Sequence, residues 1–241
     1  MVSKNQLKLI KSLQQKKYRN EHGLFFVEGF KAVNELLNSN LNLFRLLATK
    51  QFVGGFLNTE IEEIEETDLK KISALQNPSG VIAVFEIPKP MPISYEDWIV
   101  VLDNIRDPGN LGTIIRLCDW FGIKNLVCSK ETVDCFNPKV LQATMGSISR
   151  VNIVYQDLES FLVNTSLPVY GTFMKGSSIY KEDFPKAGII IMGNEANGIS
   201  PKLGTNIKNR ITIPQFGNRA TESLNVATAT AIVLSEIRGK S

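Results

Sequence analysis

The sequence predicts an α/β protein in which a small N-terminal α/β domain precedes a larger domain built on a mostly parallel sheet. Two observations predict this fold. From residue 98 onward, short apolar runs alternate with helical segments, and the runs themselves do not alternate in polarity. Such runs are typical of parallel strands that helices cover on both faces. Residues 1–90 show their own alternation of strands and helices, and a proline-rich stretch follows them.

In the N-terminal domain, the expected elements follow one another closely after residue 22. The expected strands are 24–29, 43–49 and 81–87, and the expected helices are 30–39 and 67–75. Thr67 or Asp68 is the expected N-cap of the second helix, because both residue types accept hydrogen bonds from the first free N–H groups.

The first twenty residues are basic. Six cations precede the first acid, Glu21: Lys4, Lys8, Lys11, Lys16, Lys17 and Arg19. Leu7, Ile10 and Leu13 recur at helical spacing, which predicts an amphipathic helix. Two interpretations stay open: a solvated helix face, or a surface for phosphates on which Tyr18 and Arg19 stack against bases.

The stretch PKPMPISYEDW (88–98) separates the two domains, because it holds three prolines within five residues. Proline fixes φ and removes an N–H donor, so this stretch favours a linker over a helix or strand. We therefore expect domains over 1–90 and 98–241, joined by a linker over 91–97.

The second domain is expected to contain six strands and five helices. The strands are 98–104, 124–129, 150–155, 167–173, 187–193 and 209–214, and the helices lie near 110–121, 137–144, 157–164, 200–206 and 223–237. Val226, Thr230, Val233 and Ile237 form a largely apolar stripe on the last helix, which predicts that this face is buried.

The composition of the 241 residues is that of an ordinary globular protein, with 43% hydrophobic and 21% charged residues. It disfavours disorder and coiled coil. No apolar run approaches the roughly 18 residues that a membrane span needs. The N-terminus lacks the features of a signal peptide and the three cysteines fit a reducing compartment, so we expect a cytoplasmic protein. The net charge of +3 does not by itself indicate a nucleic-acid partner.

Three polar loops follow apolar strands of the second domain. In the first, NIRDPGNLGTIIR (104–116), Asn110 is the expected N-cap, and Arg116 is expected to point away from the buried stripe that includes Ile114 and Cys118. By itself this pattern also fits a surface arginine on an ordinary helix.

The second loop, MGNEANG (192–198), places Glu195 between two glycines, and Ser200 and Pro201 then start the next helix. The third runs from Ile213 through Gly217 to Ser223 and Asn225. Tight turns and helix caps also explain these residues. Ligands bind at the carboxyl ends of strands in open α/β sheets, so the three loops are expected to share one crevice.

Together the three loops resemble the motifs of the SpoU/TrmH family of RNA ribose methyltransferases. The residues that carry the resemblance are N-x-R-D-P-x-N-x-G-x-x-x-R (104–116), M-G-N-E-x-x-G (192–198) and IPQFGNRATESLNVA (213–227). The similarity covers roughly residues 98–238. The N-terminal half, with KLIKSLQQKKYRNEHGLFFVEG (8–29), resembles the ribosomal-protein-like substrate-binding domain that rRNA-directed members carry, so the resemblance covers nearly the whole chain.

The resemblance implies a trefoil knot, a homodimer through the catalytic domain, and S-adenosylmethionine as cofactor. It implies that the cofactor site includes Met192, Gly193, Glu195, Gly198, Ile213, Ser223 and Leu224. It implies catalytic roles for Asn110, Arg116, Glu195, Ser223 and Asn225. RNA is the expected partner, with contacts from Lys16, Lys17, Tyr18, Arg19 and Arg116, whereas neither a membrane nor DNA is expected.

Methyl transfer to a ribose hydroxyl requires alignment of the three reacting atoms and removal of a proton. Few ordinary bases are available, because His22 is the only histidine and belongs to the other domain. Glu195, Asp103, Asp107 and Arg116 remain. The resemblance assigns the base to Arg116, but a guanidinium with a pKa above about 12 rarely loses its proton. Arg116 is equally suited to orient a phosphate and stabilise an oxyanion.

The sequence disfavours three other chemistries. Base methylation by a cysteine needs a nucleophilic thiolate, but Cys118 is expected in the core, and Cys128 and Cys135 lie outside the three loops. Zinc is not expected, since the chain has no CxxC and one histidine. A small-molecule methyltransferase of Rossmann type would need a glycine-rich loop after its first strand, which is missing. The expected function is 2′-O-methylation of large-subunit ribosomal RNA. A tRNA methyltransferase or a non-catalytic, RNA-binding assembly factor is the alternative.

Overall fold

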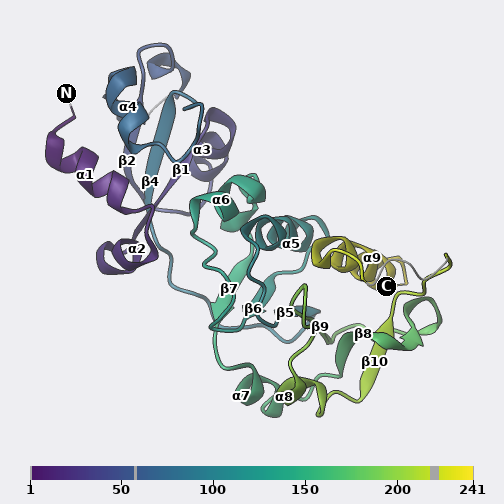
Figure 1. Cartoon of the computed structure of the whole chain (residues 1–241). Coiled ribbons are helices and arrows are strands. Elements are labelled where there is room, and N and C mark those ends of the chain that lie inside the picture. The colour runs from purple at the N-terminus through teal and green to yellow at the C-terminus, as the bar shows by residue number, and fades with distance from the viewer. Residues whose placement is uncertain (1, 57–58, 218–222, 241) are drawn as a thin grey trace. The chain divides into compact units, whose positions relative to one another are not determined.

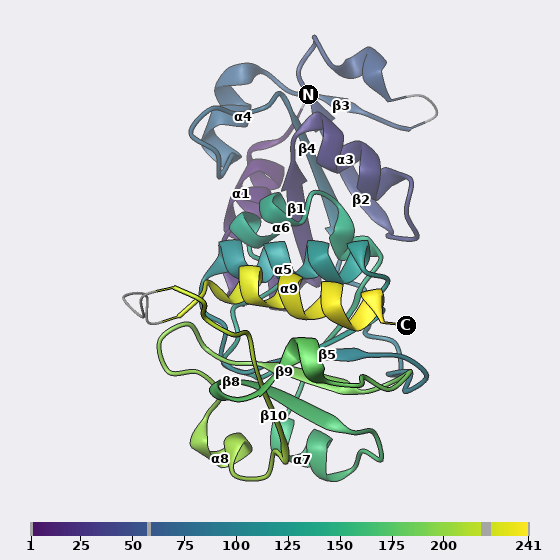
Figure 2. The same cartoon turned by 90° about the vertical axis from the view of Figure 1, so that its right-hand side faces the viewer.

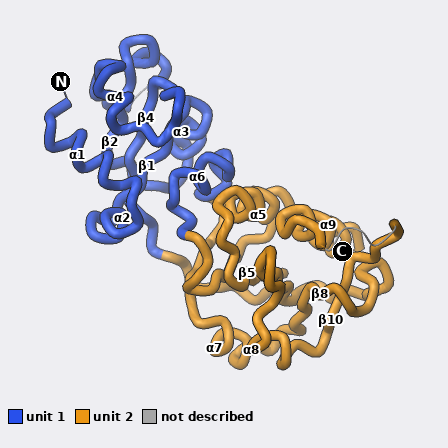
Figure 3. Tube along the Cα trace, viewed as in Figure 1, with its two compact units in different colours: residues 1–89, 134–149 blue, residues 90–133, 150–241 orange. Residues whose placement is uncertain are grey.

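The computed structural model describes residues 2–56, 59–217 and 223–240. The chain forms two compact units, coloured separately in Figure 3. Unit 1 comprises Met1–Lys89 together with Asp134–Ser149, and unit 2 comprises Pro90–Val133 together with Arg150–Ser241. Each unit contains a sheet of its own.

Unit 1 is built on a four-stranded sheet in the order β1-β4-β2-β3. Its strands are β1 (Leu24–Glu28), β2 (Leu43–Ala48), β3 (Glu62–Glu63) and β4 (Val81–Glu86). β4 runs antiparallel to both neighbours, and β3 runs parallel to β2. Its helices are α1 (Lys4–Ser12), α2 (Lys16–His22), α3 (Phe30–Leu37), α4 (Glu66–Ile72) and α6 (Pro138–Thr144). The three predicted strands of this domain are confirmed.

The sheet of unit 1 is buried on both faces: successive side chains of a strand point to opposite faces, and here both sets are apolar and buried. On one face Phe26 and Val84 join a cluster with Ile10 of α1 and Leu69 of α4. On the other face the rings of Phe25 and Phe85 lie 5.8 Å apart. Unit 1 therefore has a continuous apolar core despite its small size.

The N-terminal segment forms two helices where one was predicted. α1 begins with a capping box in which Ser3 and Gln6 exchange hydrogen bonds between side chain and backbone. α2 follows after a break at 13–15 and ends at Gly23, whose φ of 65° suits glycine. The predicted cap of the later helix is also wrong, because α4 begins after Glu65 and not at Thr67 or Asp68.

Unit 2 is built on a six-stranded, fully parallel sheet in the order β10-β8-β9-β5-β6-β7. Its strands are β5 (Ile99–Leu102), β6 (Asn125–Cys128), β7 (Asn152–Tyr155), β8 (Val169–Ser178), β9 (Ile189–Met192) and β10 (Asn209–Thr212). All six predicted strands are confirmed. The prediction of a parallel sheet made from continuous apolar runs is confirmed as well.

Helices cover both faces of this sheet. α5 (Pro108–Trp120) and α9 (Val226–Gly239) lie side by side on one face, and α7 (Leu158–Val163) and α8 (Pro201–Gly204) lie on the other (Figures 1 and 2). The stripe of Val226, Thr230, Val233 and Ile237 is buried, as predicted. This layering brings the start of α9 close to the start of α5.

Residues 134–149 were expected in the second domain, but they pack with unit 1. The ring of Phe136 lies 4.7 Å from the ring of Phe25 in β1. Gly146 has a φ of 94°, and a Cβ added there would lie 2.3 Å from the side chain of Glu35. Unit 1 is therefore completed by a segment that follows it by more than forty residues.

Asn152 fixes the start of unit 2 through two hydrogen bonds. Met91 N–H donates to Asn152 Oδ1 at 2.9 Å, and Asn152 Nδ2 donates to the Met91 carbonyl at 3.0 Å. Part of the predicted linker is thus attached to β7 and does not hang free.

Candidate active site

The first two loops begin side by side because their strands are neighbours in the sheet. β5 and β9 pair in parallel, with Leu102 opposite Met192. The pairing extends one residue further, since Asp103 N–H donates to the Met192 carbonyl at 3.0 Å. The buried Asp103 also accepts a hydrogen bond from Ser200 N–H at 2.7 Å, which holds the start of α8.

The first loop turns sharply at Asn104, which has a φ of 60°. Asn104 N–H donates to Ser129 Oγ at 3.0 Å, so β6 supports the turn from below. α5 then begins at Pro108, with Asp107 as the N-cap that accepts a hydrogen bond from Asn110 N–H at 2.7 Å. The predicted cap, Asn110, is wrong. Asp107 precedes the N1 proline and takes that role, which leaves the Asn110 side chain available for other contacts.

The second loop is a tight hairpin. Asn194 and Gly198 exchange two backbone hydrogen bonds of 2.9 and 2.8 Å. Gly193 needs to be glycine, because a Cβ there would lie 2.2 Å from the backbone of Gly198 and Ile199. Gly198 itself has a φ of 67°. The glycines on either side of Glu195 therefore have a structural reason, and they fix where its carboxylate lies.

The third loop joins the other two at the start of α9. Asn225 is the N-cap of α9, and its Oδ1 accepts hydrogen bonds from Ala227 and Thr228 N–H. Its Nδ2 then donates to Asn110 Oδ1 at 2.8 Å. Residues 218–222 of the third motif lie outside the described residues.

A continuous polar chain connects the three loops. Asn225 donates to Asn110, Asn110 Nδ2 donates to Glu195 Oε1 at 2.9 Å, and Asn194 Nδ2 donates to Glu195 Oε2 at 3.3 Å. Asn194 Nδ2 also donates to the Asn104 carbonyl at 2.7 Å. The structure thus brings together three of the predicted catalytic side chains, those of Asn110, Glu195 and Asn225.

Arg116 lies one and a half turns beyond Asn110 on α5 and is exposed, as the helical spacing predicted. Among the described residues, nothing forms a hydrogen bond or ion pair with its guanidinium. Trp120, one turn further, is 82% exposed. α5 therefore presents a cation and an aromatic ring on its outer side, beyond the polar chain.

The residues expected to bind the cofactor differ in accessibility. Met192 is buried, and its carbonyl accepts from Asp103, so it supports the site from below. Gly193, Glu195 and Ile213 are half-buried, whereas Gly198 and Ser223 are exposed. Leu224, directly before Asn225, is 49% exposed.

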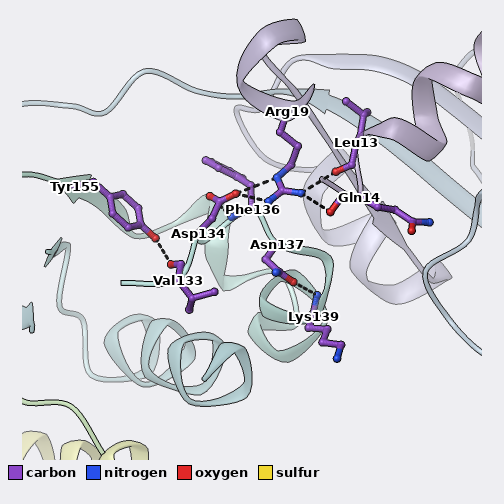
Figure 4. A network of polar contacts seen from close by, with 9 residues as sticks. All are labelled: Leu13, Gln14, Arg19, Val133, Asp134, Phe136, Asn137, Lys139 and Tyr155. Atoms are coloured by element: carbon purple, nitrogen blue, oxygen red, sulfur yellow. Dashed lines mark hydrogen bonds and ion pairs between the residues drawn. The ribbon is translucent and has the colours of Figure 1, made fainter. Parts of the chain in front are cut away.

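The predicted RNA contacts in unit 1 divide into two kinds. Lys16 and Lys17 are exposed, and the ring of Tyr18 stacks on His22 at 6.4 Å. Arg19, in contrast, is 2% exposed. Its Nε donates to Asp134 Oδ2 at 3.0 Å, and its Nη1 donates to the carbonyls of Leu13 and Gln14 (Figure 4). The prediction that Arg19 contacts RNA is corrected, because its guanidinium is buried and donates its hydrogen bonds to residues of unit 1.

Asn194 was missed as a member of the site. All the contacts of its side chain lie within the first two loops, and its Oδ1 accepts from Ala196 and Asn197 N–H. An asparagine that precedes a short glycine-containing turn is typical of such backbone contacts. That signal was present in the sequence, but it did not reveal the two contacts that the amide donates.

The comparisons with known proteins agree with these motifs. The model of the SpoU rRNA Methylase family matches residues 97–235. The chain belongs to the SpoU family. The model of an MRM3-like substrate binding domain matches residues 4–83, which lie in unit 1. The SpoU match spans residues 134–149, although these pack with unit 1.

Relatives and solved structures cover almost the whole of this SpoU chain. A Bacillus subtilis protein named as a 23S rRNA (guanosine(2553)-2'-O)-methyltransferase is 31% identical over 98% of both chains. The structure of a putative TrmH-family RNA methyltransferase from Porphyromonas gingivalis is 38% identical, with a TM-score of 0.89 over 100% of both chains. That of an AdoMet-bound rRNA methyltransferase from Sinorhizobium meliloti is 32% identical, with a TM-score of 0.87, and covers 99% of this chain and 97% of that one.

The cysteines of this SpoU protein are structural. The thiols of Cys118, Cys128 and Cys135 are all buried. Burial raises the pKa of the Cys118 thiol far above its ordinary value, which disfavours the thiolate that a nucleophile needs. No group of three or more histidine, cysteine or acidic side chains suited to a metal ion occurs within residues 2–56, 59–217 and 223–240. No helix in that part of the chain is long and apolar enough to cross a membrane.

Proposed function

We propose that this protein transfers a methyl group from S-adenosylmethionine to a ribose 2′-hydroxyl in large-subunit ribosomal RNA, which releases S-adenosylhomocysteine and the hydroxyl proton. The observation that carries the proposal is the polar chain from Asn225 through Asn110 to Glu195, which joins three separate loops at the ends of parallel strands. The name of the Bacillus subtilis relative supports the choice of RNA and of the 2′-hydroxyl.

The second and third loops fit the proposed cofactor. Gly193 lets the backbone of the second loop close tightly on Gly198 and Ile199, and half-buried Ile213 and exposed Leu224 offer apolar surface beside polar groups. We expect Gly193, Gly198, Ile213, Ser223 and Leu224 to contact the cofactor, with Met192 beneath them. The bound cofactor supplies an electrophilic methyl group. The AdoMet-bound relative from Sinorhizobium meliloti supports this assignment.

Side chains of the protein orient the substrate and stabilise charge. Arg116 orients an RNA phosphate by paired hydrogen bonds and stabilises negative charge on the attacking oxygen. Glu195 is a carboxylate held at both oxygens by amides, and Asn110 fixes its direction. Ser223 and Asn225 place the start of α9 against this arrangement. In this mechanism alignment contributes the larger share of the rate, because an in-line displacement depends steeply on geometry.

The assembly and the finer fold belong to the same proposal. Membership of the SpoU family supports a trefoil knot near the second and third loops and a homodimer through unit 2. The exposed Trp120 on α5 fits a surface that a second copy or the RNA covers. The bacterial origin of the Bacillus subtilis relative supports a reaction in the cytoplasm.

The test compares ribosomal RNA from a wild-type strain and a deletion strain. Mass analysis of nucleosides is expected to show loss of one 2′-O-methyl nucleotide from large-subunit RNA, and the purified protein is expected to restore it with tritiated cofactor. Loss from tRNA would instead identify a tRNA enzyme. Unchanged methylation in both RNAs, together with a ribosome-assembly defect, would favour the non-catalytic factor.

A further inference from the structure

The side chain of Asn194 uses its full hydrogen-bonding capacity within the site. Its Oδ1 accepts from Ala196 N–H at 3.0 Å and Asn197 N–H at 3.1 Å. Its Nδ2 donates to the Asn104 carbonyl at 2.7 Å and to Glu195 Oε2 at 3.3 Å. The oxygen therefore serves the second loop, and the nitrogen reaches outward to the first loop and to the carboxylate.

The Asn104 carbonyl is a fixed anchor. Asn104 has a φ of 60°, and its N–H is held by Ser129 Oγ. Ser129 Oγ lies 3.2 Å from Thr132 Oγ1, and both hydroxyls are buried. Asn104 Oδ1 also accepts from Arg106 Nε at 3.0 Å. A contact to this carbonyl ties the second loop to a turn that cannot shift without breaking several other hydrogen bonds.

We infer that Asn194 is a positioning residue for methyl transfer: by donating to Asn104 and Glu195, it fixes the Glu195 carboxylate against Asn110. The inference rests on the proposed function. Without these donated bonds only Asn110 directs the carboxylate, and a displacement of about 1 Å in such a site costs on the order of 100-fold in rate.

Asn194→Asp separates this role from a purely structural one. The introduced carboxylate has nearly the same shape and still accepts from Ala196 and Asn197 N–H, so the hairpin turn is kept. It cannot donate, and it places a second negative charge beside Glu195. Two adjacent carboxylates share a proton with one pKa raised. Protonation restores a donor, so activity relative to wild type should recover as the pH falls.

The other charged groups near this position have partners already. Asp103 accepts from Ser200 N–H, Asp107 caps α5, and Arg106 donates to Asn104. These charged groups are unchanged in Asn194→Asp. The ratio of the kcat values of the variant and of wild type therefore reports the effect of the new carboxyl group alone. Asn197→Ala is the matched control. Asn197 is exposed in the same hairpin, and its side chain makes no hydrogen bond with the described residues.

The experiment measures kcat and KM on ribosomal RNA, across pH, for wild type, Asn194→Asp and Asn197→Ala. We expect Asn194→Asp to lose about 100-fold in kcat at neutral pH with little change in KM for RNA, and to regain part of it at lower pH. Asn197→Ala is expected to match wild type. A kcat for Asn194→Asp equal to that of the control at every pH overturns the inference, whereas an inactive wild type overturns the proposed function.

A second measurement does not depend on activity. Denaturant unfolding of Asn194→Asp, Glu195→Gln and the double variant gives the coupling between the two side chains. We expect Asn194→Asp to destabilise the protein clearly less in the Glu195→Gln background, because the amide can donate to the new carboxylate. No coupling between the two substitutions would overturn the contact, and with it the inference, even if the protein methylated nothing.

Discussion

Asn225 Nδ2 donates to Asn110 Oδ1 at 2.8 Å, although 115 positions separate the two residues in the chain. Each residue stands at the start of a helix: Asn225 caps α9, and Asn110 lies in the first turn of α5. The packing of α9 beside α5 makes the contact possible. Two loops that follow strands on different parts of the sheet are therefore joined through helix starts.

Asn110→Ala removes both contacts of this amide and should lower kcat at least tenfold, which corresponds to about 1.4 kcal/mol. The reason is that Glu195 loses one of its two amide donors and Asn225 loses its acceptor. A tritiated-methyl assay on ribosomal RNA measures the effect. Asn206→Ala, at an exposed asparagine elsewhere in unit 2, should behave as wild type. Equal activity in both variants would exclude a role for the chain of amides.

Arg116→Ala should abolish methyl transfer and leave cofactor affinity largely intact. Arg116 is exposed and lies beyond the polar chain, and we propose that it contacts the RNA and not the cofactor. Isothermal titration with S-adenosylmethionine beside the methyl-transfer assay separates the two effects. Arg116→Lys keeps the charge but loses the paired geometry, so it should restore little. An Arg116→Ala protein that still methylates RNA would refute the assignment.

Much of the site could be predicted because its signals are local. Apolar strands and turn residues predicted the three loops, and helical spacing predicted that Arg116 is exposed and Cys118 buried. The contacts that join Asn110 to Glu195 and Asn225 could not be predicted, since they span 85 and 115 positions and depend on strand order.

Two of the errors have the same origin, a contact with residues far along the chain. Arg19 stands among exposed lysines, and nothing near it in the chain indicates that its partner, Asp134, follows 115 positions later. Residues 134–149 carry no change in composition that separates them from unit 2. Their place in unit 1 follows from packing of Phe136 and Gly146 on distant elements. Local patterns thus predicted elements and loops, but they did not predict contacts between residues that lie far apart in the chain.

RNA binding should weaken steeply with salt, and cofactor binding should not. Exposed Lys16 and Lys17 are suited to contact phosphates, and each neutralised phosphate of single-stranded RNA contributes about 0.7 to the slope of log K against log salt. Replacing both lysines by alanine should reduce the slope by about 1.4, as filter binding over a salt series would show. Lys70→Ala together with Lys31→Ala, at exposed lysines on other helices of unit 1, is the control pair. An unchanged slope after replacement of Lys16 and Lys17 would place the RNA elsewhere.

Cys118→Ala should keep methyl transfer near the wild-type rate, and the native protein should resist thiol modification. All three thiols are buried, and burial raises the pKa of Cys118. Reaction with a chromogenic disulfide should therefore be slow until denaturant is added. Loss of activity in a folded Cys118→Ala protein would indicate that the Cys118 thiol takes part in catalysis.

Arg19→Ala should destabilise the protein by about 3–5 kcal/mol, because it leaves a mostly buried carboxylate and two backbone carbonyls without their donor. The cost falls on unit 1, where Arg19 holds residues 13–14 and Asp134 together. A double-mutant cycle with Asp134→Asn measures the pair itself. If Arg19 serves RNA and not the fold, Arg19→Ala will unfold at the wild-type denaturant concentration and lose RNA affinity in proportion to one phosphate. The structure predicts the reverse: Arg19→Ala lowers the free energy of unfolding strongly. When RNA binding is measured well below the unfolding transition, the slope of log K against log salt stays that of wild type.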